Sequence, residues 1–247
     1  MSTNDAYGQL LRDLLDGKDV FEIVERDDGF VYVFAAQYLL APFRKWPSLD
    51  RRTMRYVRGR VLDLGCGGGR VALHLQARGL EVVGIEVSAG AVDVCRHRGV
   101  RDVRACAIED VDESLGLFDT IVMLGNNFGL LGSKSRGKRL LRRFHRLTTE
   151  RARILAQTFD PHTLVDEVHR AYLERNRRRG RLSGQQRLRV RYRTAATPWF
   201  DYLQVSETEL AQLLDGTGWR LDRTLRDEGA SYVALLAKGR RAGRADG

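Results

Sequence analysis

The segment from Val61 to Arg70, which reads VLDLGCGGGR, constrains the fold of this chain more than any other feature. An apolar run ends in glycines at 65, 67, 68 and 69, and Arg70 opens a stretch with helical spacing. Glycines between a strand and a helix leave main-chain N–H groups and the positive helix terminus open to a ligand. The segment therefore predicts a strand, a tight loop that binds a nucleotide-type ligand, and a helix.

The spacing of the glycines excludes two common nucleotide loops. A dinucleotide fingerprint requires G-x-G-x-x-G, but Arg70 stands at the sixth position, where the third glycine would allow close helix packing. A P-loop requires a Gly-Lys-Ser/Thr sequence, and none follows here. The ligand of the loop is therefore expected to be another nucleotide-type molecule.

From residue 60 onward, short apolar runs alternate with helical stretches. The strand candidates are residues 61–64, 80–85, 100–107, 118–124 and 153–159, and helical spacing covers residues 70–78 and 134–147. Repeated strand, helix and strand units imply right-handed crossovers and a parallel sheet covered on both faces. Residues 219–225 and 232–237, joined by a turn-rich tetrapeptide, predict a terminal antiparallel hairpin. The expected class is a doubly wound α/β fold.

Segments outside this alternation suggest five regions. We expect an N-terminal helical and aromatic cap (1–58), a cofactor-binding α/β core (59–160), a basic cap insertion (161–205), a C-terminal helix and hairpin that complete the sheet (206–238), and a disordered tail (239–247). Within the cap insertion, residues 187–193 alternate strictly between arginine and apolar or aromatic side chains. This period of two predicts a strand with one arginine face and one apolar face.

Composition excludes several classes of protein. A hydrophobic content of 43% with only four prolines is not that of a disordered chain. The N-terminal run from Phe30 to Phe43 has 14 uncharged residues, whereas a membrane span needs about 20 apolar residues. The first thirty residues lack the pattern of a secretory signal. The three cysteines form no CxxC pair, so we expect neither a metal site nor a disulfide framework. Because the sequence shows neither a membrane span nor a secretory signal, we expect a cytoplasmic protein without a membrane partner.

The excess positive charge is concentrated in one part of the chain. Residues 134–193 contain nineteen Lys and Arg but five Asp and Glu, while the whole chain has a formal charge of +10. Such a stretch attracts phosphate-rich partners, or it forms solvated faces of an arginine-rich protein. Both interpretations are open from the sequence.

Four motifs in order resemble the class I S-adenosylmethionine-dependent methyltransferases. An acidic residue followed by G-x-G-x-G is their common first motif, and Asp63 with the glycines at 65, 67 and 69 matches it. Glu86 ends the next strand candidate 21 residues after Gly65, where the family has an acid for ribose hydroxyls. Residues 107–110 match the position of the adenine contact, although Cys106 stands where relatives often have aspartate.

The fourth motif is Gly125-Asn126-Asn127-Phe128, at the end of the 118–124 strand candidate. It is similar to the Gly-Asn-Ser-Phe segment of small-molecule N-methyltransferases such as glycine N-methyltransferase. The resemblance covers residues 60–159 and, in outline, the final hairpin. It implies a mostly parallel seven-stranded Rossmann-like sheet with a terminal antiparallel hairpin and cap elements. It also implies S-adenosyl-L-methionine as cofactor and S-adenosyl-L-homocysteine as product, with no metal.

The cofactor-binding residues implied by the resemblance lie in these four motifs: Asp63, Gly65, Cys66, Gly67, Gly69, Glu86, Val87, Ala107, Ile108, Glu109, Leu124, Gly125 and Asn126. Two roles are open for Asp63. An acid at this position contacts the ligand, or it braces the glycine loop.

Acceptor groups are expected beyond the carboxyl ends of the fourth and fifth strands, where open α/β sheets bind ligands. The catalytic candidates there are Asn127, Asp160 and His162, each of which could instead cap a turn. The substrate-binding candidates are Asn127, Phe128, Tyr192, Trp199, Asp201 and Tyr202. Aromatic rings with one carboxylate suit a cationic amine, although such a cluster also serves as packing of the cap.

The resulting hypothesis is metal-independent methyl transfer to a nitrogen or oxygen of a small-molecule acceptor by in-line displacement. One alternative is an RNA methyltransferase that uses the basic residues 134–193. Against it, Asn126-Asn127-Phe128 lacks the prolines of the Asn-Pro-Pro-Phe/Tyr signature of base-directed amino methylation. The other alternative is a non-catalytic cofactor-binding interaction protein.

Overall fold

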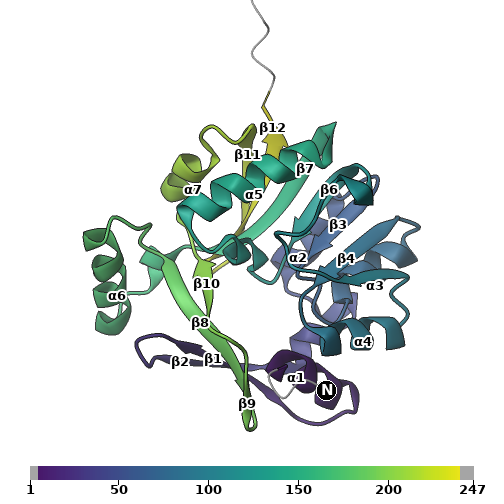
Figure 1. The fold of residues 1–247 in the computed structure, drawn as a ribbon, viewed down its shortest axis with the longest axis horizontal. Coiled ribbons are helices and arrows are strands. Elements are labelled where there is room, and N and C mark those ends of the chain that lie inside the picture. Colours follow the sequence, from purple (N-terminus) through teal and green to yellow (C-terminus); the bar gives the residue numbers. More distant parts are fainter. Residues whose placement is uncertain (1–4, 240–247) are drawn as a thin grey trace, which may run out of the picture.

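A seven-stranded sheet forms the core of the computed structural model, which describes residues 5–239 (Figure 1). Its strands follow the order β11-β12-β7-β6-β3-β4-β5. Their bounds are β3 (Val61–Leu64), β4 (Val82–Glu86), β5 (Asp102–Ala105), β6 (Phe118–Met123), β7 (Thr148–Phe159), β11 (Trp219–Arg226) and β12 (Ser231–Lys238). The strands from β5 to β7 are parallel, and β12 runs antiparallel to both of its neighbours. This confirms the predicted sheet and its terminal hairpin.

Helices cover both faces of this sheet because successive strand residues point to opposite sides. Leu62 of β3 packs in one core cluster with Phe144 of α5 (Lys134–Arg146) and Leu213 of α7 (Glu207–Leu214). Val61 packs in the other cluster with Leu75 of α3 (Arg70–Ala77). The helices α2 (Ser48–Thr53) and α4 (Ala89–His97) also lie on this second side. The strands β3 and β4, which are apolar apart from Asp63 and Glu86, are thereby buried on both faces, as a parallel sheet requires.

A second sheet was not predicted. It contains β1 (Phe21–Arg26), β2 (Val31–Ala35), β8 (Gln185–Tyr192) and β10 (Phe200–Leu203), and the short β9 (Ala195–Ala196) pairs with β8. The turn at Asp28 and Gly29 joins β1 to β2, so the N-terminal region contains a β-hairpin besides its helix. β8 shows the predicted alternation, with its arginines on the more exposed side. Figure 1 shows this sheet below the core, with β10 rising towards it.

The N-terminal helix α1 (Ala6–Leu15) packs beside α4 of the core (Figure 1). The Asp5 carboxylate caps α1 through Gly8, and it also accepts hydrogen bonds from the Ser88 hydroxyl (2.7 Å) and the Gly90 N–H (2.8 Å) at the start of α4. A Cβ on Gly90 would lie 2.8 Å from the Cα of Gly8, so only glycines permit this close approach. The first sheet, α1 and the second sheet are therefore tied together beside the end of β4.

The remaining elements are short, apart from α6 (Glu167–Arg178). The 3₁₀ turns are η1 (Ala36–Leu40), η2 (Phe43–Lys45), η3 (Met54–Tyr56), η4 (Glu113–Leu115), η5 (Asn127–Leu131) and η6 (Pro161–Thr163). Within residues 5–239, no helix has the length and apolar character needed to cross a bilayer. The predicted tail, apart from Gly239, lies outside the described residues, and the division into five regions stays a prediction.

Helix α5 allows a test of how its two faces contribute to stability. Phe144 has no exposed surface, and its replacement by alanine leaves a cavity in the main core. We expect Phe144→Ala to lower the free energy of unfolding by about 3–5 kcal/mol. Arg139 lies on the exposed side of the same helix, and Arg139→Ala should stay within about 0.5 kcal/mol of the wild type. Urea unfolding followed by circular dichroism measures both, and equal effects would contradict the assignment of the buried face.

Candidate active site

The loop between β3 and α3 has the predicted glycine backbone, but residues 66–69 are buried and the N–H groups of Gly65, Cys66, Gly67 and Gly69 are bonded within the chain. Gly65, Gly67 and Gly69 all have positive φ angles, of 70°, 54° and 78°, which favour glycine. The N–H groups of Gly65 and Cys66 donate to the Ile85 carbonyl and hold the loop against β4. A Cβ on Gly67 would lie 2.8 Å from the hydroxyl of Tyr7 in α1. The loop therefore faces a tyrosine of the N-terminal helix, a contact that the sequence did not indicate.

Glu86, the last residue of β4, holds the glycine loop from the side. Its carboxylate accepts hydrogen bonds from the N–H groups of Gly67 (3.0 Å), Val87 (2.8 Å) and Ser88 (3.0 Å). Burial raises the pKa of this carboxyl, and the three N–H donors oppose the shift. Val87 itself is exposed. The predicted second motif thus lies directly against the first.

Asp63 is buried in β3 beneath the loop, and its Oδ2 atom has no hydrogen-bond partner among the described residues. Burial raises the pKa of this carboxyl to about 7, while the charge of Arg70 opposes the shift. An unpartnered buried carboxylate oxygen is costly, and native structures keep such groups where a ligand or function compensates. Both predicted roles of Asp63 therefore stay open: its free oxygen suits contact with a ligand, and its position under the loop suits bracing of the loop.

A chain of buried polar side chains, which was not predicted from the sequence, connects the glycine loop with the end of β6. Arg70 pairs with Asp50 of α2 (2.7 Å), and Gln157 of β7 donates to the same carboxylate (3.1 Å). The side-chain amide oxygen (Oε1) of Gln157 accepts a hydrogen bond from the N–H of Gly125 (2.6 Å). Asn126 follows with a left-handed backbone (φ 61°), and its Oδ1 atom is buried without a partner. Two unsatisfied oxygens, on Asp63 and Asn126, therefore lie at the ends of adjacent strands.

The other motif residues have varied surroundings. The Asn127 amide donates to the carbonyls of Leu64 (3.1 Å) and Gly65 (2.6 Å), so it braces the glycine loop from the β6 side. Phe128 is fully buried in the main core. Glu109, in the loop after β5, pairs with Arg136 of α5. Ala107 and Ile108 are half-buried in the same loop, Leu124 is buried, and Cys66 is buried with its sulfur 4.0 Å from that of Cys95.

The second sheet brings one predicted substrate residue to the loops. The Tyr202 hydroxyl donates to the Asn126 carbonyl (2.6 Å), and its ring covers Gly129. By contrast, Asp201 is exposed and lies opposite Arg187 on the other side of the sheet. The ring of Trp199 lies under the Arg189 guanidinium at 4.6 Å, and the Tyr192 hydroxyl donates to Asp13.

The two catalytic candidates after β7 make contacts with the cap insertion. The Asp160 carboxylate accepts from the N–H of His162 and caps η6. The His162 ring contacts the Ser183 hydroxyl (3.1 Å) and the Arg177 guanidinium (3.2 Å). No contact between either residue and the glycine loop is present in the described part of the chain, and their catalytic roles stay predictions.

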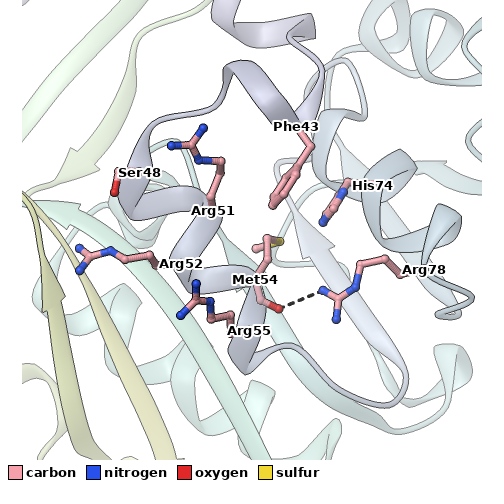
Figure 2. Close-up of a pocket in the computed structure, with 8 residues that line it drawn as sticks. All are labelled: Phe43, Ser48, Arg51, Arg52, Met54, Arg55, His74 and Arg78. Carbon is pink, nitrogen blue, oxygen red and sulfur yellow. Dashed lines mark hydrogen bonds between the residues drawn. The ribbon is translucent and has the colours of Figure 1, made fainter.

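A separate basic pocket of about 600 Å³ lies at another place on the molecule (Figure 2). Its lining consists of four arginines, two stacked rings and two further side chains: Arg51, Arg52, Arg55, Arg78, Phe43, His74, Ser48 and Met54. The Arg78 guanidinium donates to the Met54 carbonyl (3.1 Å), as Figure 2 shows. None of the predicted site residues lines this pocket.

Comparison with known proteins identifies the core. A family model described as a methyltransferase domain matches residues 61–151, from the start of β3 into β7. Residues 61–151 therefore form a methyltransferase domain. A crystal structure of an S-adenosylmethionine-dependent methyltransferase from Bacteroides fragilis, in complex with S-adenosyl-L-homocysteine, is similar to the chain. The TM-score is 0.82 over 97% of both chains, at 24% sequence identity.

Two other similarities to this methyltransferase domain are more partial. The Burkholderia thailandensis 1,6-didemethyltoxoflavin-N1-methyltransferase, with its bound substrate and S-adenosylhomocysteine, has a TM-score of 0.52 at 19% identity. That match covers 77% of this chain and 78% of the other. The putative methyltransferase YqeM of Bacillus subtilis is 26% identical over 111 residues, 43% of this chain. The chain spans 44% of the length of that curated relative.

Within the described residues, no group of three or more His, Cys, Asp or Glu side chains is placed to hold a metal ion.

The raised pKa of Asp63 predicts a pH dependence of stability. The carboxyl binds its proton more tightly in the folded state, so stability is lost as the pH rises through about 7. Between about pH 6 and about pH 8 the loss amounts to about 1.4 kcal/mol. Asp63→Asn cannot titrate, and we expect its free energy of unfolding without ligand to lack this component. Urea unfolding of both proteins at the two pH values measures the difference, and equal pH dependence would contradict the shift.

Proposed function

We propose that this protein transfers a methyl group from S-adenosylmethionine to a nitrogen or oxygen of a small-molecule acceptor. The carrying observation is the glycine loop, whose backbone is held by Glu86 and faces Tyr7 of the N-terminal helix. Elements on both sides of the methyltransferase core thus meet where the fold places its cofactor. A site between a core and its cap suits an enclosed reaction with a small molecule.

The residues present fit the cofactor. Added side chains at Gly65 or Gly67 would strike Asn127 or Tyr7, so glycine at both positions lets these side chains lie close to the loop backbone. The unpartnered oxygens of Asp63 and Asn126 are acceptors, and Glu86 adds a third. Acceptor oxygens match a ligand that carries an ammonium group, a sulfonium and ribose hydroxyls. Glu86 would hold the ribose, while Asp63 and the Gly65–Gly69 backbone would hold the methionine part.

The bound cofactor would supply an electrophilic methyl group on sulfur. The chain would then contribute mainly position, because in-line displacement depends on distance and alignment. Asn127 keeps the glycine loop in place, and Tyr202 fixes the carbonyl of Asn126. Asp160 and His162 are proposed to contact the acceptor from the end of β7.

The charges of the cap favour this proposal over RNA methylation. Arg189 and Arg191, on the arginine face of β8, both pair with Glu25 of β1. In α5, Arg136 and Lys138 pair with Glu109 and Asp215. Arginines that are paired with carboxylates contribute less to phosphate binding. The name of the Burkholderia neighbour, which bears a small-molecule substrate, supports the same choice.

Binding of the reaction product tests the cofactor assignment. Glu86→Gln keeps the size of the side chain but loses the carboxylate that would accept from ribose hydroxyls. We expect its affinity for S-adenosyl-L-homocysteine to fall about tenfold, as lost hydrogen bonds to a charged group are worth about 1.5 kcal/mol or more. Isothermal titration calorimetry measures the affinity. Glu81 precedes the same strand and is exposed, so Glu81→Gln is the control that should bind normally. Unchanged affinity of Glu86→Gln would exclude the proposed role.

The acceptor class is tested by incubating the protein with methyl-labelled cofactor and separate pools of metabolites and RNA. We expect label in a molecule of the metabolite pool. Label in the RNA pool alone would establish the alternative function, and product binding without any label in either pool would favour a non-catalytic role. The Gly67→Val variant, which blocks the loop, should abolish labelling.

A further inference from the structure

The two faces of the second sheet differ sharply in chemistry. Side chains opposite each other in an antiparallel pair lie on the same face. Glu22 shares a face with Val24, which lies opposite Val190. In β8, every second residue from Val190 to Gln186 lies on this same face, and Gln186 is opposite Tyr202 of β10. Because Tyr202 contacts Asn126, this face is turned towards the cofactor loops.

The other face of β1 carries Glu25, and its surroundings contrast with those of Glu22. Glu25 has two cationic partners, Arg189 (2.8 Å) and Arg191 (3.1 Å). Glu22 pairs with no lysine, arginine or histidine among the described residues, and its hydrogen bond is from the Tyr38 hydroxyl (2.9 Å). Burial raises the pKa of the Glu22 carboxyl, which the Tyr38 hydrogen bond opposes. Glu22 is half-buried, and unlike Glu25 it has no cationic partner among the described residues to compensate its charge.

Three tyrosines surround this carboxylate. Besides Tyr38, the hydroxyls of Tyr7 and Tyr202 lie near enough for the charge of Glu22 to raise their pKa, after the larger effect of burial. Tyr7 lies over Gly67, and Tyr202 lies on Asn126, so the cluster borders both cofactor loops. Tyr38 is 39% exposed, which leaves the cluster open to solvent from one side. The cluster is defined by Glu22, Tyr7, Tyr38 and Tyr202.

We propose that this cluster binds the methyl acceptor, that the acceptor is a small amine, and that Glu22 holds its ammonium group and takes its proton. The inference rests on the proposed methyl transfer and specifies its substrate class. An ammonium group supplies the missing cation, and tyrosine ring faces attract it further. A neutral alcohol would leave the carboxylate charge uncompensated. The geometry thus favours nitrogen over oxygen as the methylated atom.

Methyl transfer to the amine takes place in two parts, a proton transfer to Glu22 and a displacement at the methyl carbon. The bound ammonium passes one proton to a carboxylate oxygen of Glu22, and this frees the lone pair of the nitrogen. The lone pair forms the new N–C bond to the methyl carbon, and the C–S bond breaks with its electron pair left on sulfur. The products are a methylated ammonium and a neutral thioether. A carboxyl whose pKa is raised by burial is a better proton acceptor than an exposed one.

The groups that face Glu22 from the packed elements set its titration. Tyr38 comes from η1, Tyr7 from α1 and Tyr202 from β10. Beyond them, Glu86 acts on Tyr7 and the positive charge of Arg70 acts on Tyr38.

The test uses full-length protein saturated with S-adenosyl-L-homocysteine and three matched pairs of probes. These are benzylamine and benzyl alcohol, phenethylamine and phenethyl alcohol, and butylamine and butanol. Calorimetry measures binding, and labelled cofactor measures methylation. We expect at least one amine to bind about tenfold or more tightly than its alcohol, which corresponds to one charge-assisted contact. If no amine exceeds its alcohol, the amine assignment is wrong.

Two substitutions on one strand assign the effect to Glu22. Glu22→Gln should lose the preference for amines while its S-adenosyl-L-homocysteine affinity stays within about twofold of the wild type. Glu25→Gln, on the opposite face, should keep both. Retained amine preference in Glu22→Gln would overturn the proposal. If that variant does not fold, Tyr38→Phe provides the same test, since it removes the hydroxyl that orients the carboxylate. Failure of the wild type to bind S-adenosyl-L-homocysteine would instead refute the proposed methyl transfer itself.

Discussion

The site depends on one carboxylate that joins two loops. Glu86 receives N–H groups from Gly67 in the first loop and from Val87 and Ser88 in the turn after β4. Ser88 in turn caps α4 and donates to Asp5, which caps α1. A single side chain at a strand end therefore sets the shape of the glycine loop and, through Ser88, the position of the helix that covers it. Because the linked groups are buried, small shifts in one are transmitted to the others.

The cap and the core are structurally interdependent. β1 and β8 pair although more than 160 residues separate Ile23 from Arg191, and the α/β core lies between them in the sequence. β10 then returns to the core, where Tyr202 closes on Asn126. The N-terminal segment can therefore reach its final place only after the insertion beyond β7 has been made, and such non-local pairing carries a large loop-closure cost. The cap is therefore built from the N-terminal segment and the insertion after β7, and each contacts the core loops, through Tyr7 and Tyr202 respectively.

The sequence predicted the parts of the molecule whose information is local. The glycine loop, Glu86, the parallel strands and the terminal hairpin follow from periodicity, turn residues and short spacing. The second sheet could not be predicted, because β1 and β2 have mixed patterns and their partner lies far along the chain. Arg70, Asp50 and Gln157 escaped for the same reason: each is an ordinary polar residue until the fold brings the three together. The motif residues could be identified from their spacing in the sequence, whereas the contacts of Arg70, Asp50 and Gln157 are visible only in the tertiary structure.

The alternation in β8 illustrates a limit of pattern analysis. Its arginine face was predicted and is present, and the excess positive charge suggested an anionic partner. In the structure, Glu25 of β1 pairs with Arg189 and Arg191 of that face, while Glu22 on the other face has no cationic partner among the described residues. The electrostatic character of the site is thus opposite to that of the segment that forms its wall. A strand contributes only alternate residues to each side, so net charge along a segment describes the surface it presents to solvent, and the inward residues of the neighbouring strand decide what the site can bind.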